Sequence, residues 1–512
     1  MNNKIRSCGI LLHPTSLPGR QGIGTLGDEA RVFVDFLEKS GIGLWQILPI
    51  GPVGFGNSPY AARSAFAGNE MLIDLDQLVV EGLLDLTDVF RPLMFPSASV
   101  DFPAVEAFKR PMLKKAAERF LQMDNPGEQR SFEDFCQKNA DWLDDYCLYM
   151  ALCDHYQDSR WYSMWESGLR ERQPAAMEKW TVSQANGIRI WKVLQYLFSK
   201  QWKALKAYAN AHQVRLVGDI PIFVAYDSVD AWSNRRYLKI DAQGRSTALS
   251  GVPPDAFSRT GQLWGNPVYD WEALRKDGFS WWVRRMEVAF QLTDMVRIDH
   301  FRGFDAYWEV PAGETTAQNG VWVSAPGPAL FDTLYKRLGK LPVFAEDLGV
   351  ITDSVESLRD TNGFPGMKVA QFAFDLKAPG VLDAYNRYLP HNYDYNCVAY
   401  SGTHDNNTTQ GWYDSLDDAH KDIVRRYLAC SDHEVVWHLV RAVMASHARY
   451  AIFPMQDFLH IGSSGRMNTP GTCGEPNWCW RMERGALNDG LADSIRSMAA
   501  LFGRLAQVTG LD

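Results

Sequence analysis

Eight short apolar segments with β-type composition restrict the fold of this chain more than any other feature. Turn residues bound each segment, and helical patterns lie between many of them. They occupy residues 7–13, 43–50, 214–220, 294–299, 342–346, 367–373, 397–402 and 450–456. Eight strands that alternate with helices are typical of a (β/α)8 barrel, so we predict an α/β fold of this kind.

The spacing of these segments is uneven, and this predicts where insertions lie. We expect a helical insertion at approximately 70–213, after the second strand, and another at approximately 225–290, after the third, which carries a loop of the active site. The clearest helical patterns are at 28–38, 108–123, 133–154, 188–212, 330–340, 353–361 and 433–450, with closing helices in 486–511. Residues 1–512 are predicted to form a single catalytic barrel, with the large, mainly helical insertions on the catalytic face and no separate C-terminal β domain.

The composition excludes several classes of protein. The net charge is -9, and the chain has no dense tract of Lys and Arg of the kind that forms a nucleic-acid surface. No apolar run approaches the length of a membrane span. The 8 cysteines are scattered without a CxxC pair, which argues against a zinc ribbon or a disulfide framework and favours the cytoplasm. The 18 Trp, 20 Tyr and 26 Phe residues suit a large core, and some of them suit a groove that binds sugars.

Three carboxylates stand where a predicted strand meets a polar loop. Asp299, Glu346 and Asp405 follow the fourth, fifth and seventh strands. A buried charge needs partners, so carboxylates at three such positions indicate the mouth of a barrel in which chemistry takes place.

The residue pattern assigns different tasks to two of these acids. Strand alternation places Arg297 on the same face as Asp299, where its charge would keep the carboxylate ionised and oriented as a nucleophile. Like-charge neighbours and partial burial would raise the pKa of Glu346 and make it a proton donor. A retaining glycosidase uses such a pair about 5–5.5 Å apart. Asp405, beside His404, would then bind sugar hydroxyls and stabilise an oxocarbenium-like transition state.

Two other kinds of site share parts of these motifs. Asp299-His300 and His404-Asp405 offer metal ligands, but the chain has no HExxH and no His-x-His after the first strand. Residues 22–27 spell GxGxxG, yet the next strand does not end in the acid that a dinucleotide site needs. We expect these glycines to shape a tight loop at the barrel mouth.

Motifs along almost the whole chain resemble the amylomaltases, which are 4-α-glucanotransferases related to the α-amylase superfamily. The motifs are His13-Pro-Thr-Ser-Leu-Pro-Gly19, Gly56-Asn-Ser-Pro-Tyr60, Ser64-Ala-Phe-Ala-Gly-Asn69, Gly218-Asp-Ile-Pro-Ile-Phe-Val224, Gly251-Val-Pro-Pro-Asp255, Gly261-Gln-Leu-Trp-Gly-Asn-Pro267, Arg297-Ile-Asp-His-Phe-Arg-Gly303, Glu346-Asp-Leu-Gly349, Thr403-His-Asp-Asn-Asn407 and Arg466-Met-Asn-Thr-Pro-Gly471. Several long motifs in one order make the resemblance specific.

The resemblance implies the same roles for the three acids: Asp299 as nucleophile, Glu346 as general acid/base and Asp405 as the stabilising carboxylate. It also implies substrate-binding residues. Tyr60, Asp219, Arg297 and His404 would hold the donor sugar, and Ser58, Trp264, Asp347 and Asn468 would line the neighbouring subsites. Neither a cofactor nor a metal is implied. Where the family commonly carries Tyr-Phe and then Ser-Glu on a mobile loop, this chain has Ala256-Phe257 and Ser258-Arg259, so the lid is expected to be looser.

The expected reaction is transfer of α-1,4-glucan segments from glucans and maltooligosaccharides to glucose or maltooligosaccharide acceptors, with retention. The same carboxylates serve a retaining α-glucan hydrolase, because either water or a sugar hydroxyl can resolve a glycosyl ester. That alternative stays open on the residues alone. A non-enzymatic glucan-binding module would use the aromatic residues without needing three convergent acids.

Overall fold

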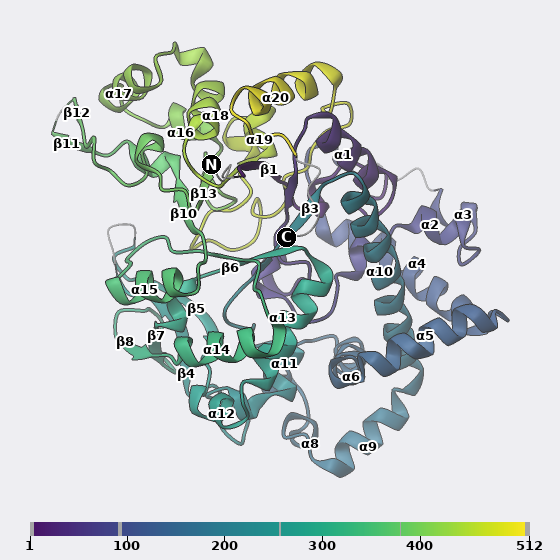
Figure 1. Ribbon diagram of the computed structural model, residues 1–512. Coiled ribbons are helices and arrows are strands. Elements are labelled where there is room, and N and C mark those ends of the chain that lie inside the picture. The colour runs from purple at the N-terminus through teal and green to yellow at the C-terminus, as the bar shows by residue number, and fades with distance from the viewer. Residues whose placement is uncertain (1–4, 91–94, 255–257, 379, 507–512) are drawn as a thin grey trace.

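A closed barrel of eight parallel strands forms the centre of the computed structural model (Figure 1). The structure describes residues 5–90, 95–254, 258–378 and 380–506. The barrel strands are β1 (Ser7–Leu11), β2 (Leu44–Gln46), β3 (Arg215–Ile220), β6 (Met295–Ile298), β9 (Val343–Ala345), β10 (Gly366–Val369), β13 (Cys397–Tyr400) and β14 (Tyr450–Pro454). Each lies within one of the eight predicted segments or overlaps it closely, so the predicted (β/α)8 fold is confirmed.

The barrel closes where β1 pairs with both β14 and β2. Cys8 lies opposite Ala451 on one side, and Gly9 lies opposite Leu44 on the other. All residues of β1, β2, β6, β9, β13 and β14 are buried. Burial on both faces explains why these strands appear in the sequence as continuous apolar runs without alternation.

Helices connect most of the barrel strands and cover the outside of the barrel. Six helices come directly before the next barrel strand, and a seventh follows the last strand. They are α1 (Asp28–Lys39), α10 (Ala185–Ala211), α13 (Ser280–Leu292), α14 (Gly327–Leu338), α15 (Asp353–Thr361), α18 (Val435–Ala445) and, after β14, α20 (Asp489–Leu501). α1 begins with Asp28 and Glu29 and ends with Lys39, which complements the helix dipole at both ends. In the described part of the connection from β10 to β13 there are only short 3-10 turns and the hairpin of β11 (Leu376–Ala378) and β12 (Val381–Leu382).

The segment between β2 and β3 is helical, and Figure 1 shows it on one side of the barrel. It contains α2 (Leu75–Val80), α3 (Leu86–Val89), α4 (Phe102–Gln122), α5 (Pro126–Lys138), α6 (Ala140–Tyr156), α7 (Trp161–Met164), α8 (Ser167–Arg170) and α9 (Pro174–Ser183) before α10. The helical pattern at 133–154 is divided between α5 and α6. The break is at Asn139, whose side-chain amide donates to the carbonyl of Phe135 at 2.8 Å and ends α5.

A four-stranded antiparallel sheet lies on the opposite side of the barrel in Figure 1 and was not predicted. It has the order β5-β4-β7-β8, formed by β4 (Ala248–Val252), β5 (Gln262–Pro267), β7 (Ala306–Pro311) and β8 (Val321–Ser324). The sheet therefore joins the connection after β3 to the connection after β6. Both connections leave the carboxyl ends of barrel strands, so the sheet stands beside the barrel mouth.

The remaining α-helices of the described chain lie in the connections after β3 and β13 and after β14. They are α11 (Val229–Ser233), α12 (Trp271–Lys276), α16 (Thr409–Asp414), α17 (Asp418–Leu428) and α19 (Met455–Phe458). No helix in the described ranges has both the length and the apolar character needed to cross a bilayer.

Candidate active site

Two of the predicted catalytic acids follow neighbouring barrel strands. Asp299 comes directly after β6, and Glu346 comes directly after β9. The amide of Asp299 donates to the carbonyl of Ile220 at 3.0 Å, and the amide of Glu346 donates to the carbonyl of Ile298 at 3.0 Å. The barrel ladder thus continues through both acids and fixes their backbones side by side at the carboxyl end of the sheet.

Arg297 joins two carboxylates beneath this mouth. One guanidinium nitrogen lies 2.7 Å from Asp219, and another lies 2.9 Å from Asp299. Burial alone would lower the pKa of Arg297, but the charges of Asp219 and Asp299 raise it well above its ordinary value. The contact with Asp299 that strand alternation predicted is confirmed, and the guanidinium offsets the charge of a nucleophile held there.

Glu346 has different surroundings, because its carboxyl group meets backbone amides. It accepts hydrogen bonds from the amides of His300 and Leu348, each at 2.8 Å. Burial raises the pKa of Glu346 to about 7, and the charge of Asp299 contributes in the same direction, while Arg297 and the two amides oppose the shift. A carboxyl group with this pKa holds a proton near neutral pH and can give it to a leaving oxygen.

Asp405 lies on the loop after β13 and is fixed by three neighbours. Its carboxylate accepts a hydrogen bond from the side-chain amide of Asn468 at 2.7 Å and lies 3.3 Å from Nε2 of His404. Its backbone carbonyl accepts a hydrogen bond from Arg466 at 2.9 Å. The side chain of Asp405 remains 42% exposed, so it is held in place and still open to a ligand.

The rings of Tyr60 and His404 and the buried carboxylate of Asp219 connect Asp405 to Arg297. The hydroxyl of Tyr60 donates to Asp219 at 2.8 Å, and its ring stacks on His404 with centroids 5.2 Å apart. Burial raises the pKa of Asp219 to about 7, although the charge of Arg297 opposes this shift. Burial also lowers the pKa of His404, which favours the neutral imidazole, although the charge of Asp405 opposes this shift. Tyr60, Asp219, Arg297 and His404, predicted as one sugar-binding group, are therefore joined by a continuous chain of contacts in which Tyr60 links His404 to Asp219 and Arg297.

Two of the residues predicted for the neighbouring subsites stand at the edge of this cluster. Trp264, on β5, is 36% exposed and meets the ring of His300 edge-on at 4.8 Å. Ser58 caps the short 3-10 helix of Tyr60 by accepting a hydrogen bond from its amide at 3.3 Å. His300, which follows Asp299, and the backbone of Tyr60 thus link these two positions to the mouth.

Asp347 does not join the cluster, which differs from the predicted substrate contact. Its side chain is 1% exposed, and one carboxylate oxygen forms an ion pair with Arg359. The other oxygen accepts a hydrogen bond from the amide of Met367 at 2.6 Å. Both oxygens are engaged between β9 and β10, so in this structure Asp347 fixes the loop that carries Glu346.

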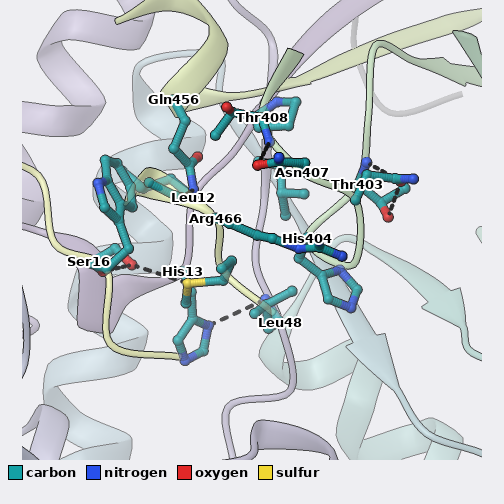
Figure 2. A pocket seen from close by; sticks show the side chains of 16 residues that line it. Leu12, His13, Ser16, Leu48, Thr403, His404, Asn407, Thr408, Gln456 and Arg466 are labelled. Carbon is teal, nitrogen blue, oxygen red and sulfur yellow. Dashed lines mark hydrogen bonds between the residues drawn. The ribbon is translucent and has the colours of Figure 1, made fainter. Parts of the chain in front are cut away.

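A small hollow of about 20 Å³ is lined by His404 and by residues at and after the ends of β1, β13 and β14 (Figure 2). His13 lies on its wall and accepts a hydrogen bond from the amide of Leu48 at 3.2 Å. Burial lowers the pKa of His13 to about 3, so this ring is neutral. The hollow has room for about one water molecule, so the side chains next to His404 are closely packed.

The residue prediction missed Trp478 and the role of His300. Trp478 is 6% exposed, and its ring centroid lies 5.8 Å from that of Tyr60 and 6.0 Å from that of His404. It has a positive φ of 66° in a loop without strand or helix pattern, so no periodicity marks it. His300 also has a positive φ, of 50°, and this turn aims its amide at Glu346.

Among the residues that the structure describes, no group of three or more His, Cys, Asp and Glu side chains is arranged to hold a metal ion. Asp255, Ala256 and Phe257 lie outside the described ranges, so the predicted looser lid at Ala256-Phe257 stays a prediction.

The family model of the 4-alpha-glucanotransferases matches residues 12–488. The 4-alpha-glucanotransferase of Thermus thermophilus is 47% identical over 98% of this chain and 99% of its own length. That of Synechocystis sp. is 46% identical over 98% of each chain. The solved structure of Streptococcus agalactiae amylomaltase in complex with acarbose superimposes with a TM-score of 0.93 at 37% identity, covering 98% of this chain and 99% of that one. The chain belongs to the 4-alpha-glucanotransferase family, and it is an enzyme of that type.

Proposed function

We propose that the chain disproportionates α-1,4-glucans by a double displacement at Asp299. A carboxylate oxygen of Asp299 attacks the anomeric carbon of the donor sugar. The bond to the leaving glucan breaks, and its oxygen takes the proton of Glu346. A 4-hydroxyl of the acceptor then attacks the same carbon, the glycosyl ester breaks, and the hydroxyl proton returns to Glu346. Inversion at each step gives net retention.

One observation carries this proposal. Two carboxyl groups that follow adjacent strands have different partners. Asp299 forms an ion pair with Arg297, whereas Glu346 is buried and accepts hydrogen bonds from backbone amides. Such a difference in environment separates a charged nucleophile from a proton donor.

The remaining residues support binding of the sugar at this centre. Asp405 is exposed and oriented by Asn468, so it can face the positive charge that develops on the ring. Tyr60, Asp219, Arg297 and His404 are assigned to the donor sugar. Ser58, Trp264 and Asn468 are assigned to the neighbouring subsites. Donors are α-1,4-glucans and maltooligosaccharides, and acceptors are glucose or maltooligosaccharides.

A cytoplasmic location is proposed alongside this activity. All eight cysteines are free, and Cys8, Cys147, Cys153, Cys397 and Cys479 are buried. Free buried thiols suit a reducing compartment.

The experiment is incubation of the pure protein with maltotriose. Transfer predicts that glucose and oligomers longer than maltotriose appear together while the number of reducing ends stays constant. Asp299→Asn should remain folded by circular dichroism and lose essentially all turnover, because the amide cannot form the glycosyl ester. Reducing ends that rise in step with substrate loss would identify the alternative retaining hydrolase. Substantial turnover in folded D299N would remove Asp299 from the role of nucleophile.

A further inference from the structure

An exposed indole stands on the outer edge of the four-stranded sheet. Trp322, on the edge strand β8, is 41% exposed. It pairs across the sheet with Trp308 of β7, and the two ring centroids are 5.2 Å apart at an interplanar angle of 67°. Trp308 is anchored because its indole nitrogen donates to the carbonyl of Ala317 at 2.8 Å. Trp322 therefore rests against a fixed neighbour.

A buried cation supports one face of this indole. The guanidinium carbon of Arg302 lies 3.8 Å from the ring centroid of Trp322, within the range of a cation–π contact. Arg302 is only 8% exposed, so its guanidinium covers the inner face of the ring. The solvent-accessible surface of Trp322 is consequently on the other side, where the ring offers a flat apolar surface of fixed orientation.

This surface lies over the junction of the two catalytic loops. Arg302 is three positions after Asp299, in the 3-10 helix η6 (Phe301–Phe304). It donates to the carbonyl of Val350, four positions after Glu346. Val350 is itself 64% exposed. The support of Trp322 is therefore made from the loop of the nucleophile and the loop of the proton donor.

The same sheet already meets the mouth at its other edge. Trp264 of β5 contacts His300, which directly follows the nucleophile, whereas Arg302 under Trp322 belongs to the next turn of the same segment. Two exposed indoles thus flank one short stretch of chain that begins at the reacting centre.

We propose that Trp322 is an outer subsite for the α-1,4-glucan chain, where the apolar face of a sugar ring stacks on the exposed face of the indole. This inference rests on the proposed function, since it takes the same substrate further along the same site. Aromatic rings at sugar sites supply area with little loss of conformational freedom, and here Arg302 and Trp308 fix the ring in advance. A second copy of the chain is the other occupant that an exposed edge strand invites.

The test measures binding in the D299N background, in which turnover does not consume the ligand. Titration calorimetry compares maltotriose with maltoheptaose for D299N alone and for D299N combined with Trp322→Ala. A ring that stacks on a distant sugar predicts that W322A weakens binding of maltoheptaose about three- to tenfold and leaves maltotriose unchanged. Val321→Ala is the matched control, because Val321 is 59% exposed and points to the other face of the same strand.

Further variants separate stacking from support of the fold. Trp322→Met keeps an apolar cover on Arg302 but removes the plane, so it should show the same loss as W322A and also stands in for W322A if that variant fails to fold. Equal affinities of the parent and W322M for maltoheptaose would overturn the proposal, and so would an equal loss for maltotriose. A dimer that becomes a monomer in W322M by analytical ultracentrifugation, with glucan binding intact, would assign the surface to a second copy instead. Failure of the proposed function is visible separately, because wild-type protein would then hydrolyse maltotriose or leave it unchanged while length-dependent binding persisted.

Discussion

At the scale of single residues, the proposed mechanism divides two tasks between two chemically similar side chains, and their surroundings differ accordingly. Asp299 has a guanidinium nitrogen of Arg297 at 2.9 Å, whereas the carboxyl group of Glu346 is buried and accepts hydrogen bonds from two backbone amides. The charge of Arg297 is in turn shared with Asp219. A full positive charge and a pair of amide dipoles do not stabilise a carboxylate equally, and this inequality is what a retaining mechanism requires.

The raised pKa of Glu346 predicts the alkaline side of the pH profile. Because burial and Asp299 raise this pKa to about 7, Glu346 loses its proton as the pH rises through that value. The rate of glycosyl transfer from maltotriose should therefore fall above pH 7, by about tenfold per pH unit at the steepest. Initial rates across pH 5–9 at constant ionic strength measure this limb.

A substrate that needs no proton supplies the control for this assignment. Glu346→Gln should abolish transfer from maltotriose, because the leaving sugar oxygen cannot be protonated. It should retain formation of the glycosyl enzyme from an α-maltosyl fluoride, whose fluoride leaves without a proton. An alkaline limb that persists unchanged for the fluoride in wild-type protein would assign the limb to a group other than Glu346.

At the scale of elements, the barrel could be predicted from local pattern and the flanking sheet could not. A barrel strand buried on both faces is a short apolar run wherever it occurs, so segments such as 214–220 are visible one at a time. The sheet depends on pairing between β4 and β7, in which Gly251 lies opposite Trp308, 57 positions away in the numbering. Such pairing leaves no local period, and Gly251 and Gly265 weaken the strand signal further.

In the candidate site, too, local sequence pattern predicts some residues and long-range contacts determine the others. Residues at strand ends, such as Asp299 and Glu346, follow from the strand count alone. The partner of Asp347 does not, since Arg359 arrives from α15, and Trp478 depends on a loop with a positive φ. The glycines at 22–27 illustrate the loop that was expected: a Cβ on Gly24 would overlap the carbonyl oxygen of Pro14.

A buried lysine on α4 predicts how the helical segment responds to pH. Lys109 is 0% exposed, and its Nζ donates to Gln21 at 3.1 Å and to the carbonyl of Ile73 at 2.7 Å. Burial lowers its pKa from 10.5 to about 7, although Asp74 and Asp76 oppose the shift. Between these two values the unfolded chain binds a proton that the folded chain has released, so this group makes stability rise with pH.

Lys109→Met isolates this contribution. From pH 7.5 to 9, the free energy of unfolding of the wild type should rise relative to that of K109M by up to about 1.4 kcal/mol per pH unit. Urea unfolding of both proteins, followed by tryptophan fluorescence, measures the difference. Lys203→Met, on the outer face of α10, is the control and should leave the wild-type slope unchanged. A difference between wild type and K109M that is constant with pH would show that Lys109 keeps its proton in the folded state.

At the scale of the whole molecule, one end of the barrel holds the proposed catalytic residues and the other holds contacts that stabilise the fold. The carboxyl ends of the strands hold Asp299, Glu346 and Asp405, while the amino end is closed by the C-terminal segment. There Arg504, 0% exposed, donates to the carbonyls of four residues that precede or begin strands, at 2.7–3.2 Å: Ser7, Met444, Ser446 and Ala448. One side chain thus ties the end of the chain to β1 and to the turn before β14, the pair of strands that closes the barrel.

Removing this clamp should cost stability without changing the chemistry at the other end. Arg504→Met removes four hydrogen bonds to backbone carbonyls, of which that of Ser446 keeps a bond from Arg6. Each buried group left unpaired costs about 1–3 kcal/mol, so the free energy of unfolding should fall by about 3 kcal/mol or more. Arg496→Met is the matched control, because Arg496 lies exposed on α20 and its guanidinium donates one hydrogen bond within the described ranges, to the carbonyl of Lys39 at 3.2 Å. Urea unfolding should separate the two variants, while transfer from maltotriose at low temperature should match the wild type in both. A folded R504M with altered product lengths would show instead that the amino end of the barrel positions the mouth, because only the geometry of the strands connects Arg504 to the catalytic acids.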